Sequence, residues 1–411
     1  MFCGVITGQP QSPDADDRQK SGADGSLFWT AHAHNLAKWK LHATKSLAGG
    51  RGFVVYAVRR SGYNPVIPVL VKLRQRNRDG LGRTWRSETF RRWGSLIGGA
   101  WLGTGLVGAA GFRFSERTEH SLSLWEGEQP VLVYNYGRIS SSQAPADRAR
   151  SSYVHPLYGL DGEVLTDDFP KDHYHHRGVF WAWPHVEIGG QEYDLWLLQG
   201  IRHQFERWLQ RDTSSAAAIL AVENSWRVEE RKVMTEQAWF RVLPATAEGR
   251  AIDVELSWTP THWPVTLRGA EGKSYGGLTF RFAPHAGNPV ITVPDGATRA
   301  DLTMARLPWA DLSTQIRGAT NPSGAAIFVA PTHPDFPPEW LTRHYGVLCV
   351  GWPGVTARTL TPGQTVRVVY RIWVHRQVAA LSQLQRQYEA FTQSLSNAPP
   401  LSVANGQHGG H

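Results

Sequence analysis

Residues 251–258 read Ala-Ile-Asp-Val-Glu-Leu-Ser-Trp, and their alternation of apolar and polar residues decides the fold class. Successive side chains of a β-strand point to opposite faces of the sheet. The four apolar side chains from Ile252 to Trp258 therefore share one face, while Asp253 and Glu255 lie on the other. One buried face and one half-solvated face are typical of an antiparallel sheet.

Stretches of the same kind recur along the chain. Those rich in β-branched or aromatic residues and bounded by turn residues are Val131–Asn135, Leu278–Phe282, Ala326–Ala330, Val347–Gly351 and Val366–Val374. One helix is predicted from Val378 to Leu395, because large apolar residues recur there at every third or fourth position. With no repeat of fixed period, the sequence predicts a mostly β protein. We expect a large antiparallel β-sandwich with a C-terminal helix, and a mutarotase-like supersandwich is one form of that architecture.

The composition supports a large core and argues against one class of partner. The chain has 411 residues, of which 41% are hydrophobic and 18 are Trp. The positive net charge of +8 comes from the N-terminal part of the chain, because residues 1–92 contain 16 Lys and Arg but only 6 Asp and Glu. Residues 93–411 hold 27 against 29. The main body has no basic stripe that would follow phosphates, so we predict no nucleic-acid binding.

An uncharged segment resembles an export signal. Residues 93–112 contain no charge and seven glycines, and they follow the pair Arg91-Arg92. A paired arginine before a weakly apolar run is typical of a twin-arginine signal, and the glycines favour a cleavable signal over a permanent anchor. A single N-terminal anchor and a buried glycine-rich segment are the alternatives. With a signal or an anchor, the main body lies outside the cytoplasm, so we predict an exported protein, periplasmic or extracellular, with no membrane insertion beyond that anchor.

These observations divide the chain into four parts. Residues 1–84 lack clear periodicity, which predicts a disordered extension or translated upstream sequence. Residues 85–112 form the signal or anchor, and residues 113–396 form the sandwich. Residues 397–411 are polar and glycine-rich, which predicts a disordered tail.

The densest group of titratable side chains lies in residues 167–178, which read Asp-Asp-Phe-Pro-Lys-Asp-His-Tyr-His-His-Arg-Gly. Histidine exchanges protons near neutral pH, and arginine holds carboxylates or polarises hydroxyls. The residues predicted to carry such chemistry are His175 or His176 as the acid/base, Arg177 to orient an anionic or hydroxyl group, Tyr275 to assist, and Asp168 to fix an imidazole tautomer. The alternative is that this run is a hydrogen-bonded clasp of a loop, because structural networks contain the same groups.

A metal centre is the weaker interpretation of the same run. On an extended strand only His173 and His175 share a side, together with Arg177, and a metal site needs three or four ligands. A further ligand would come from elsewhere, such as His333, His344 or the nearby acids. The two cysteines lie far apart and offer no Cys-based zinc site and no disulfide framework. We therefore predict no cofactor, with a metal ion as the alternative.

Aromatic residues beside this run suggest a sugar ligand. The residues predicted to contact the substrate are His173, Trp181, Trp183, His333 and Trp340. The last two belong to a proline-rich segment, residues 331–340, whose stiffness suits the wall of a pocket. The alternative for the tryptophans is that they fill the core, because large rings are mostly buried.

The same residues carry a resemblance to a known family. Tyr153–Tyr158, Gly162–Pro170, His173–Gly178 and Tyr275–Leu278 are similar to segments of the PmoA-like proteins, a bacterial family of largely unknown function. The resemblance covers roughly residues 120–376. It implies an exported β-sandwich linked to sugar metabolism and carries no catalytic assignment. The family is often called methane oxygenase, but residues 113–411 contain no run near about 18 apolar residues, which excludes a membrane enzyme with several spanning helices.

Three hypotheses for function follow. The first is an enzyme that cleaves or rearranges a glycoside, as a hydrolase, lyase or isomerase. The second is a non-catalytic carbohydrate-binding module, which would present an open aromatic surface. The third is a metal-dependent oxygenase, as the family's usual name suggests.

Overall fold

The computed structural model describes residues 54–58, 67–71, 111–397 and 401–402, and the chain divides into two units, Met1–Trp101 and Leu102–His411. In the first unit, β1 (Val54–Val58) pairs with β2 (Ile67–Val71) in antiparallel register. The predicted export signal, apart from its last two residues, and the tail beyond residue 402 lie outside the described residues. Within the described residues, no helix has the length and apolar character needed to cross a membrane.

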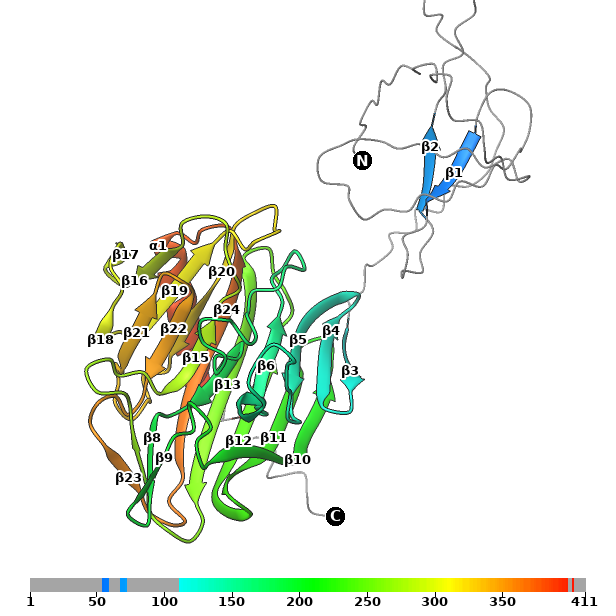
Figure 1. Ribbon diagram of the computed structural model, residues 1–411. Helices are drawn as coiled ribbons and strands as arrows, with labels where there is room; N and C mark the ends of the chain where they lie inside the picture. Colours follow the sequence, from blue (N-terminus) through cyan, green and yellow to red (C-terminus); the bar gives the residue numbers. More distant parts are fainter. Residues whose placement is uncertain (1–53, 59–66, 72–110, 398–400, 403–411) are drawn as a thin grey trace, which may run out of the picture. The chain divides into compact units, whose positions relative to one another are not determined.

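The second unit is built on two large antiparallel sheets, each with nine described strands (Figure 1). The first sheet has the order β10 (Arg202–Thr213), β11 (Ala218–Val228), β12 (Arg231–Val242), β13 (Gly249–Pro260), β24 (Val366–Arg376), β20 (Ser323–Val329), β19 (Trp309–Thr314), β16 (Val290–Val293) and β17 (Gly296–Thr298).

The second sheet has the order β18 (Thr303–Arg306), β21 (Glu339–Arg343), β22 (Val347–Gly351), β15 (Gly277–Arg281), β7 (Val179–Ala182), β6 (Tyr153–Leu157), β5 (Gln129–Asn135), β4 (Ser121–Glu126) and β3 (Phe112–Thr118). A smaller sheet has the order β23 (Arg358–Leu360), β14 (Val265–Arg268), β8 (His185–Ile188) and β9 (Gln191–Tyr193). A short 3-10 helix spans Ala146–Arg148.

The core lies between the two large sheets. Trp181 of β7 meets Phe240 of β12 with 6.3 Å between ring centroids, and Val154 of β6 belongs to the same buried cluster. The prediction of a mostly β sandwich is therefore confirmed. Each of the six stretches chosen from the sequence overlaps one strand, namely β5, β13, β15, β20, β22 and β24.

The expectation that one face of residues 251–258 would be half-solvated is wrong. Asp253 and Glu255 are only 2% and 1% exposed, because a second layer covers that face. The C-terminal helix α1 (Leu381–Asn397) packs Leu384 and Phe391 against this sheet. The acidic side chains are satisfied there: Arg371 donates to Asp253, and the backbone N–H of Leu401 donates to Glu255.

Helix α1 begins three residues later than predicted, at Leu381 instead of Val378. The carbonyl of Ala380 accepts the first bonds of the helix, from the N–H groups of Gln383 and Leu384, and Val378 is exposed. The side of the helix that bears Leu384 and Phe391 is buried, as the three-and-four spacing of apolar residues predicted.

The middle of the second sheet fixes the segment rich in histidines. The backbone N–H of Asp167 donates to the carbonyl of Arg281 at 3.0 Å, and the N–H of Arg281 donates to the carbonyl of Gly178 at 2.8 Å. Gly178 has a φ of 53°, and a Cβ there would lie 2.1 Å from the carbonyl oxygen of Val154. Only glycine fits so close an approach, so the segment is held against the end of β15.

Candidate functional site

The three histidines of the segment come together because the chain turns there and is not extended. The N–H of His173 donates to the carbonyl of Pro170 and that of His176 to the carbonyl of His173, which closes two turns. Ring centroids of His173 and His176 lie 4.7 Å apart, and those of His175 and His176 lie 4.6 Å apart. The expectation that His176 would face away from His173 and His175 is therefore wrong. We call these three residues the histidine cluster.

The histidine cluster reaches from the interior to solvent as a stack of parallel rings. His176 is 4% exposed, and the ring of His173 stacks on it at an interplanar angle of 7°. Tyr345, in the turn between β21 and β22, stacks on the other side of His173 at 4° and is 42% exposed. The Arg281 guanidinium also lies over this ring, 4.9 Å from its centroid, so Tyr345 is the partly exposed outer end of the stack.

Trp196 joins the histidine cluster to Tyr275. Its ring centroid lies 6.0 Å from that of His175, 5.5 Å from that of His176 and 4.8 Å from that of Tyr275. It also contacts Phe180 of β7, whose neighbour Trp181 points into the core. Because neighbouring side chains of a strand alternate, Trp196 and the histidine cluster lie on the outer face of the second sheet.

The imidazoles of His175 and His176 are neutral at pH 7. Burial, followed by the positive charge of Arg150, lowers the pKa of His175 from 6.5 to about 3. Burial, with His175 and Arg281 next in importance, holds the pKa of His176 well below its usual value. Burial raises the pKa of Tyr275, so that its hydroxyl remains protonated. The site therefore combines proton acceptors with a phenolic donor.

Arg281 is the cation beside the histidine cluster. Its Nη2 donates to both oxygens of Asp172, at 3.0 and 3.1 Å, and Asp172 also lies 2.9 Å from Nδ1 of His173. Burial alone would raise the pKa of Asp172, but its bonds with His173 and Arg281 lower it. The Nε and Nη1 atoms of Arg281 have no hydrogen-bond partner in the described part of the chain, although Nε lies 4.0 Å from Asp167.

Arg150 adds a second buried guanidinium. Its Nη2 donates to the carbonyls of Leu195 and Trp196, while its Nε and Nη1 have no partner among residues 111–397, 401 and 402. Burial, and then the charge of Arg177, lowers its pKa from 12.5 to about 9. Through these carbonyls it fixes the backbone of Trp196, and its charge lowers the pKa of His175.

Arg177 and Asp168 do not take the roles predicted for them. The Arg177 side chain is fully buried and donates to Asp168, to the hydroxyl of Tyr153 and to the carbonyls of Arg148 and Ile139. Its guanidinium lies 3.5 Å from the ring centroid of Phe169. With all its nitrogens occupied and no exposed surface, Arg177 is a clasp of the loop, which is the alternative that the sequence left open. Asp172, not Asp168, pairs with an imidazole of the cluster.

The tryptophans predicted to contact a sugar are core residues. Trp181, Trp183 and Trp340 are each 0% exposed. The indole N–H groups of the latter two donate to the carbonyls of Trp352, which is buried, and of Leu307, which is partly buried. The large inter-sheet space is filled by such rings, so no ligand reaches them.

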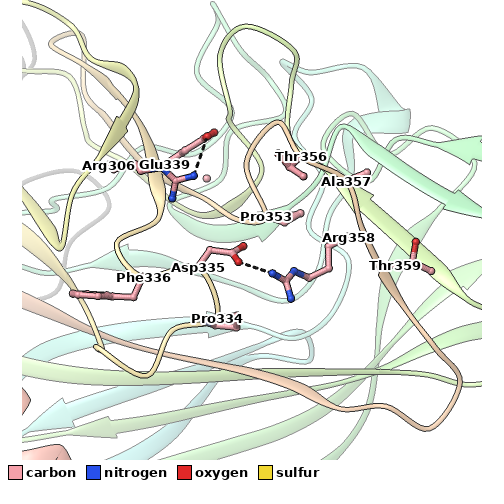
Figure 2. A pocket seen from close by; sticks show the side chains of 11 residues that line it. Arg306, Pro334, Asp335, Phe336, Glu339, Pro353, Thr356, Ala357, Arg358 and Thr359 are labelled. Atoms are coloured by element: carbon pink, nitrogen blue, oxygen red, sulfur yellow. Dashed lines mark hydrogen bonds and ion pairs between the residues drawn. The ribbon is translucent and has the colours of Figure 1, made fainter.

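His333 lies apart from the histidine cluster, although its segment does form the wall of a hollow. His333 is 4% exposed, packs on Trp352 and Tyr370, and accepts from the N–H of Asp335 through Nδ1. Burial lowers its pKa to about 3. Beside it, Pro334, Asp335, Phe336 and Glu339 line a hollow of about 560 Å³ (Figure 2). The segment thus supplies a pocket wall as predicted, but neither His333 nor Trp340 lines it.

The histidine cluster does not present a metal site. In the described ranges, no group of three or more His, Cys, Asp or Glu side chains is placed to hold a metal ion. His344, a possible further ligand, instead pairs with Asp301 at 2.7 Å.

Residues that the sequence did not single out complete the site. Arg281 and Trp196 are the main ones, with Arg150 and Tyr345 beside them. The signal for Arg281 is a charged residue that ends the otherwise uncharged strand Gly-Leu-Thr-Phe-Arg. Trp196 stands in the apolar run Leu-Trp-Leu-Leu and has no signal of its own.

Fold and site together define an antiparallel sandwich protein with a histidine-rich centre on the outer face of one sheet. Residues 121–389 match the model of DUF6807, a family of unknown function, and the chain belongs to this family. No curated protein matches the sequence. The resemblance to the PmoA-like proteins and the expected export stay predictions.

Similar solved structures share little with the chain. A GH36 α-galactosidase from Geobacillus stearothermophilus in complex with raffinose is 11% identical with a TM-score of 0.32, over 65% of this chain and 41% of that one. A galactose mutarotase related enzyme from Lactobacillus acidophilus is 10% identical, TM-score 0.31, over 64% and 97%. The heparan sulfate lyase HepC from Pedobacter heparinus is 8% identical, TM-score 0.28, over 66% and 36%. The chain thus spans about two fifths or less of the galactosidase and the lyase, and such values assign no function.

Proposed function

We propose that this chain acts on a carbohydrate by acid–base chemistry at the histidine cluster. The observation that supports the proposal is the cluster itself. Two neutral imidazoles and a protonated phenol surround Trp196, and Arg281, a guanidinium with unpaired N–H groups, is held beside the cluster through Asp172 and His173. Such groups are costly to bury without partners, which favours a role in binding and catalysis over one in folding.

The roles follow from exposure and charge. His175 is half-buried whereas His176 is buried, so His175 is the proton acceptor and His176 supports its ring. Arg281 replaces Arg177 as the group that orients the substrate. Tyr345, which contacts both His173 and Arg281 and is partly exposed, lies at the outer edge of the site and would contact a sugar that enters it.

The chemistry is a proton removal paired with a proton donation. The neutral His175 takes a proton from a substrate hydroxyl or carbon. Its pKa of about 3 in the free protein makes it a weak base, but the negative charge that develops on the substrate raises that pKa, and Arg281 stabilises the same charge. Tyr275 donates its hydroxyl proton to the oxygen that leaves or is rearranged. Proton removal from carbon with cleavage of the neighbouring C–O bond forms a C=C bond and is an elimination. Proton removal from the anomeric hydroxyl with protonation of the ring oxygen breaks the ring C–O bond, forms a carbonyl group and permits isomerisation.

The test is turnover by the full chain with and without His175. Purified protein is incubated with a panel of neutral and acidic oligosaccharides, and proton NMR of the anomeric signals follows cleavage, elimination and isomerisation together. We expect turnover of at least one sugar, and we expect His175→Ala to lower kcat by about 10²–10⁴-fold with little change in affinity.

His262→Ala is the matched control, because this histidine is exposed and its ring meets that of Trp263 edge to face, outside the histidine cluster. Its kcat should equal that of the unaltered protein. Turnover by His175→Ala at the normal rate, or no turnover of any sugar by the unaltered chain, would contradict the proposal.

A further inference from the structure

The polar hollow beside His333 lies away from the histidine cluster. It has a volume of about 560 Å³, within the range of roughly 300–1,000 Å³ for small-molecule sites. Three segments form its wall: the loop with Asp335 and Phe336, the strand pair β18–β21, and residues 353–359 (Figure 2). Because Glu339 pairs with Gly351 and Arg343 with Val347, the hollow and Tyr345 lie at opposite ends of β21 and β22.

The charges that line this hollow balance. Arg358 donates to Asp335, and Nη2 of Arg306 lies 3.7 Å from an oxygen of Glu339 (Figure 2). Two guanidinium groups and two carboxylates give a net charge of zero, which favours neither an anion nor a cation. They place donors and acceptors side by side, and a hydroxyl group both donates and accepts. The arrangement therefore suits a neutral ligand with many hydroxyls.

The rim of the hollow has an aromatic ring. Phe336 is 38% exposed, and its ring has no aromatic partner within the described part of the chain. An exposed phenyl ring is unfavourable in water, and the C–H face of a pyranose would cover it. Hydroxyl-binding side chains next to such a ring match both surfaces of a sugar.

The wall is set in place before any ligand binds. Gly354 has a φ of 76°, and a Cβ there would lie 2.5 Å from an oxygen of Glu339. The carboxylate of Glu339 is further held by the N–H of Val355 at 3.3 Å. Side chains fixed in this way lose little entropy on binding.

We propose that this hollow is a second binding site and that it takes a neutral sugar unit of an oligo- or polysaccharide. It does not depend on the reaction at the histidine cluster. It would hold the chain on a neutral glycan whether or not that glycan is the substrate.

Affinity electrophoresis of the full chain in gels that contain soluble neutral polysaccharides tests the site. The probes are xylan, galactomannan, mixed-linkage β-glucan and dextran, with polygalacturonate as the charged comparison. We expect at least one neutral glycan to retard the protein. Phe336→Ala should weaken that binding by about tenfold or more, which corresponds to about 1.4 kcal/mol. Asp335→Asn, which leaves Arg358 unpaired, should weaken neutral binding and favour polygalacturonate.

Trp263→Ala is the matched control, because Trp263 is also an aromatic residue that is 38% exposed and it lies outside the hollow. Its binding should be unchanged, and thermal melting checks that every variant folds. Failure of all neutral glycans to retard the protein, or equal binding by Phe336→Ala, would overturn the proposal. Retardation in the gel does not require turnover, so a negative result here and a failure of the proposed reaction are separate outcomes.

Discussion

Replacement of Arg177 with Met should lower the free energy of unfolding by about 3–5 kcal/mol. The guanidinium is fully buried and bonds to Asp168, to Tyr153 and to the carbonyls of Arg148 and Ile139. Methionine fills similar space but supplies no donors, so the part-buried Asp168 carboxylate would lose its charged partner and keep only the Tyr153 hydroxyl, and two carbonyls would lose a donor. Urea unfolding followed by tryptophan fluorescence measures the loss, because the second unit buries many indole rings.

Arg207→Met provides the comparison for that measurement. Arg207 is also paired with a carboxylate, that of Glu223, but its side chain is 63% exposed. An exposed pair contributes about 0–1 kcal/mol, so this variant should unfold almost as the unaltered chain does. Similar losses for the two variants would show that the clasp at Arg177 is not the interaction that holds the loop.

The second large effect is a loss of stability in acid. The pKa values of His175 and His333 fall from 6.5 to about 3 on folding, chiefly because both rings are buried. Between pH 3 and pH 6.5 the unfolded chain binds more protons than the folded one. The free energy of unfolding therefore increases with pH across this range and decreases as the pH falls. Each histidine contributes a slope of up to about 1.4 kcal/mol per pH unit. His375, whose pKa is raised by Asp311 despite its burial, acts in the opposite sense above pH 6.5.

Urea unfolding at a series of pH values from 7 to 4 measures this slope. His333→Gln should reduce it by about 1.4 kcal/mol per pH unit, because one buried ring is gone. His262→Gln, at an exposed position, should leave it unchanged. A pH-independent free energy of unfolding, or the same slope in both variants, would show that these buried rings do not resist protonation.

The strands were predictable because their patterns are local. Val347–Gly351 was predicted with the bounds of β22, and the alternation around Val254 gave the correct inner face of β13. The outer face was not predictable, because the helix that covers it lies more than 120 residues further along the chain. A polar residue in a strand indicates solvent only when no other layer packs on it, as Asp253 shows.

The site was predictable in place but not in its members. The histidine segment stands out by composition. Tyr275 is connected to it through Trp196, whose ring contacts both Tyr275 and the histidines. The geometry of this segment depends on two turns. The sequence predicted an extended strand, in which only alternate side chains lie on the same side. Arg281 meets Asp172 across 109 residues of sequence, and they come together through the pairing of β15 with β7 and the backbone bonds of Arg281 with Asp167 and Gly178.

Helix α1, which covers the first sheet, limits how far the chain can be shortened at its C-terminal end. The family match stops at residue 389, but Phe391, Ser394 and Ser402 lie beyond it and contact Arg371 or Glu255. A chain that ends at residue 389 would lose about half of α1 and expose the side of the sheet that bears Phe328. The buried carboxylate of Glu255 would also lose its hydrogen-bond donors Leu401 and Ser402. The truncation would leave an exposed apolar surface. Expression of the shortened chain should therefore yield aggregates, even though the chain keeps all strands of both large sheets.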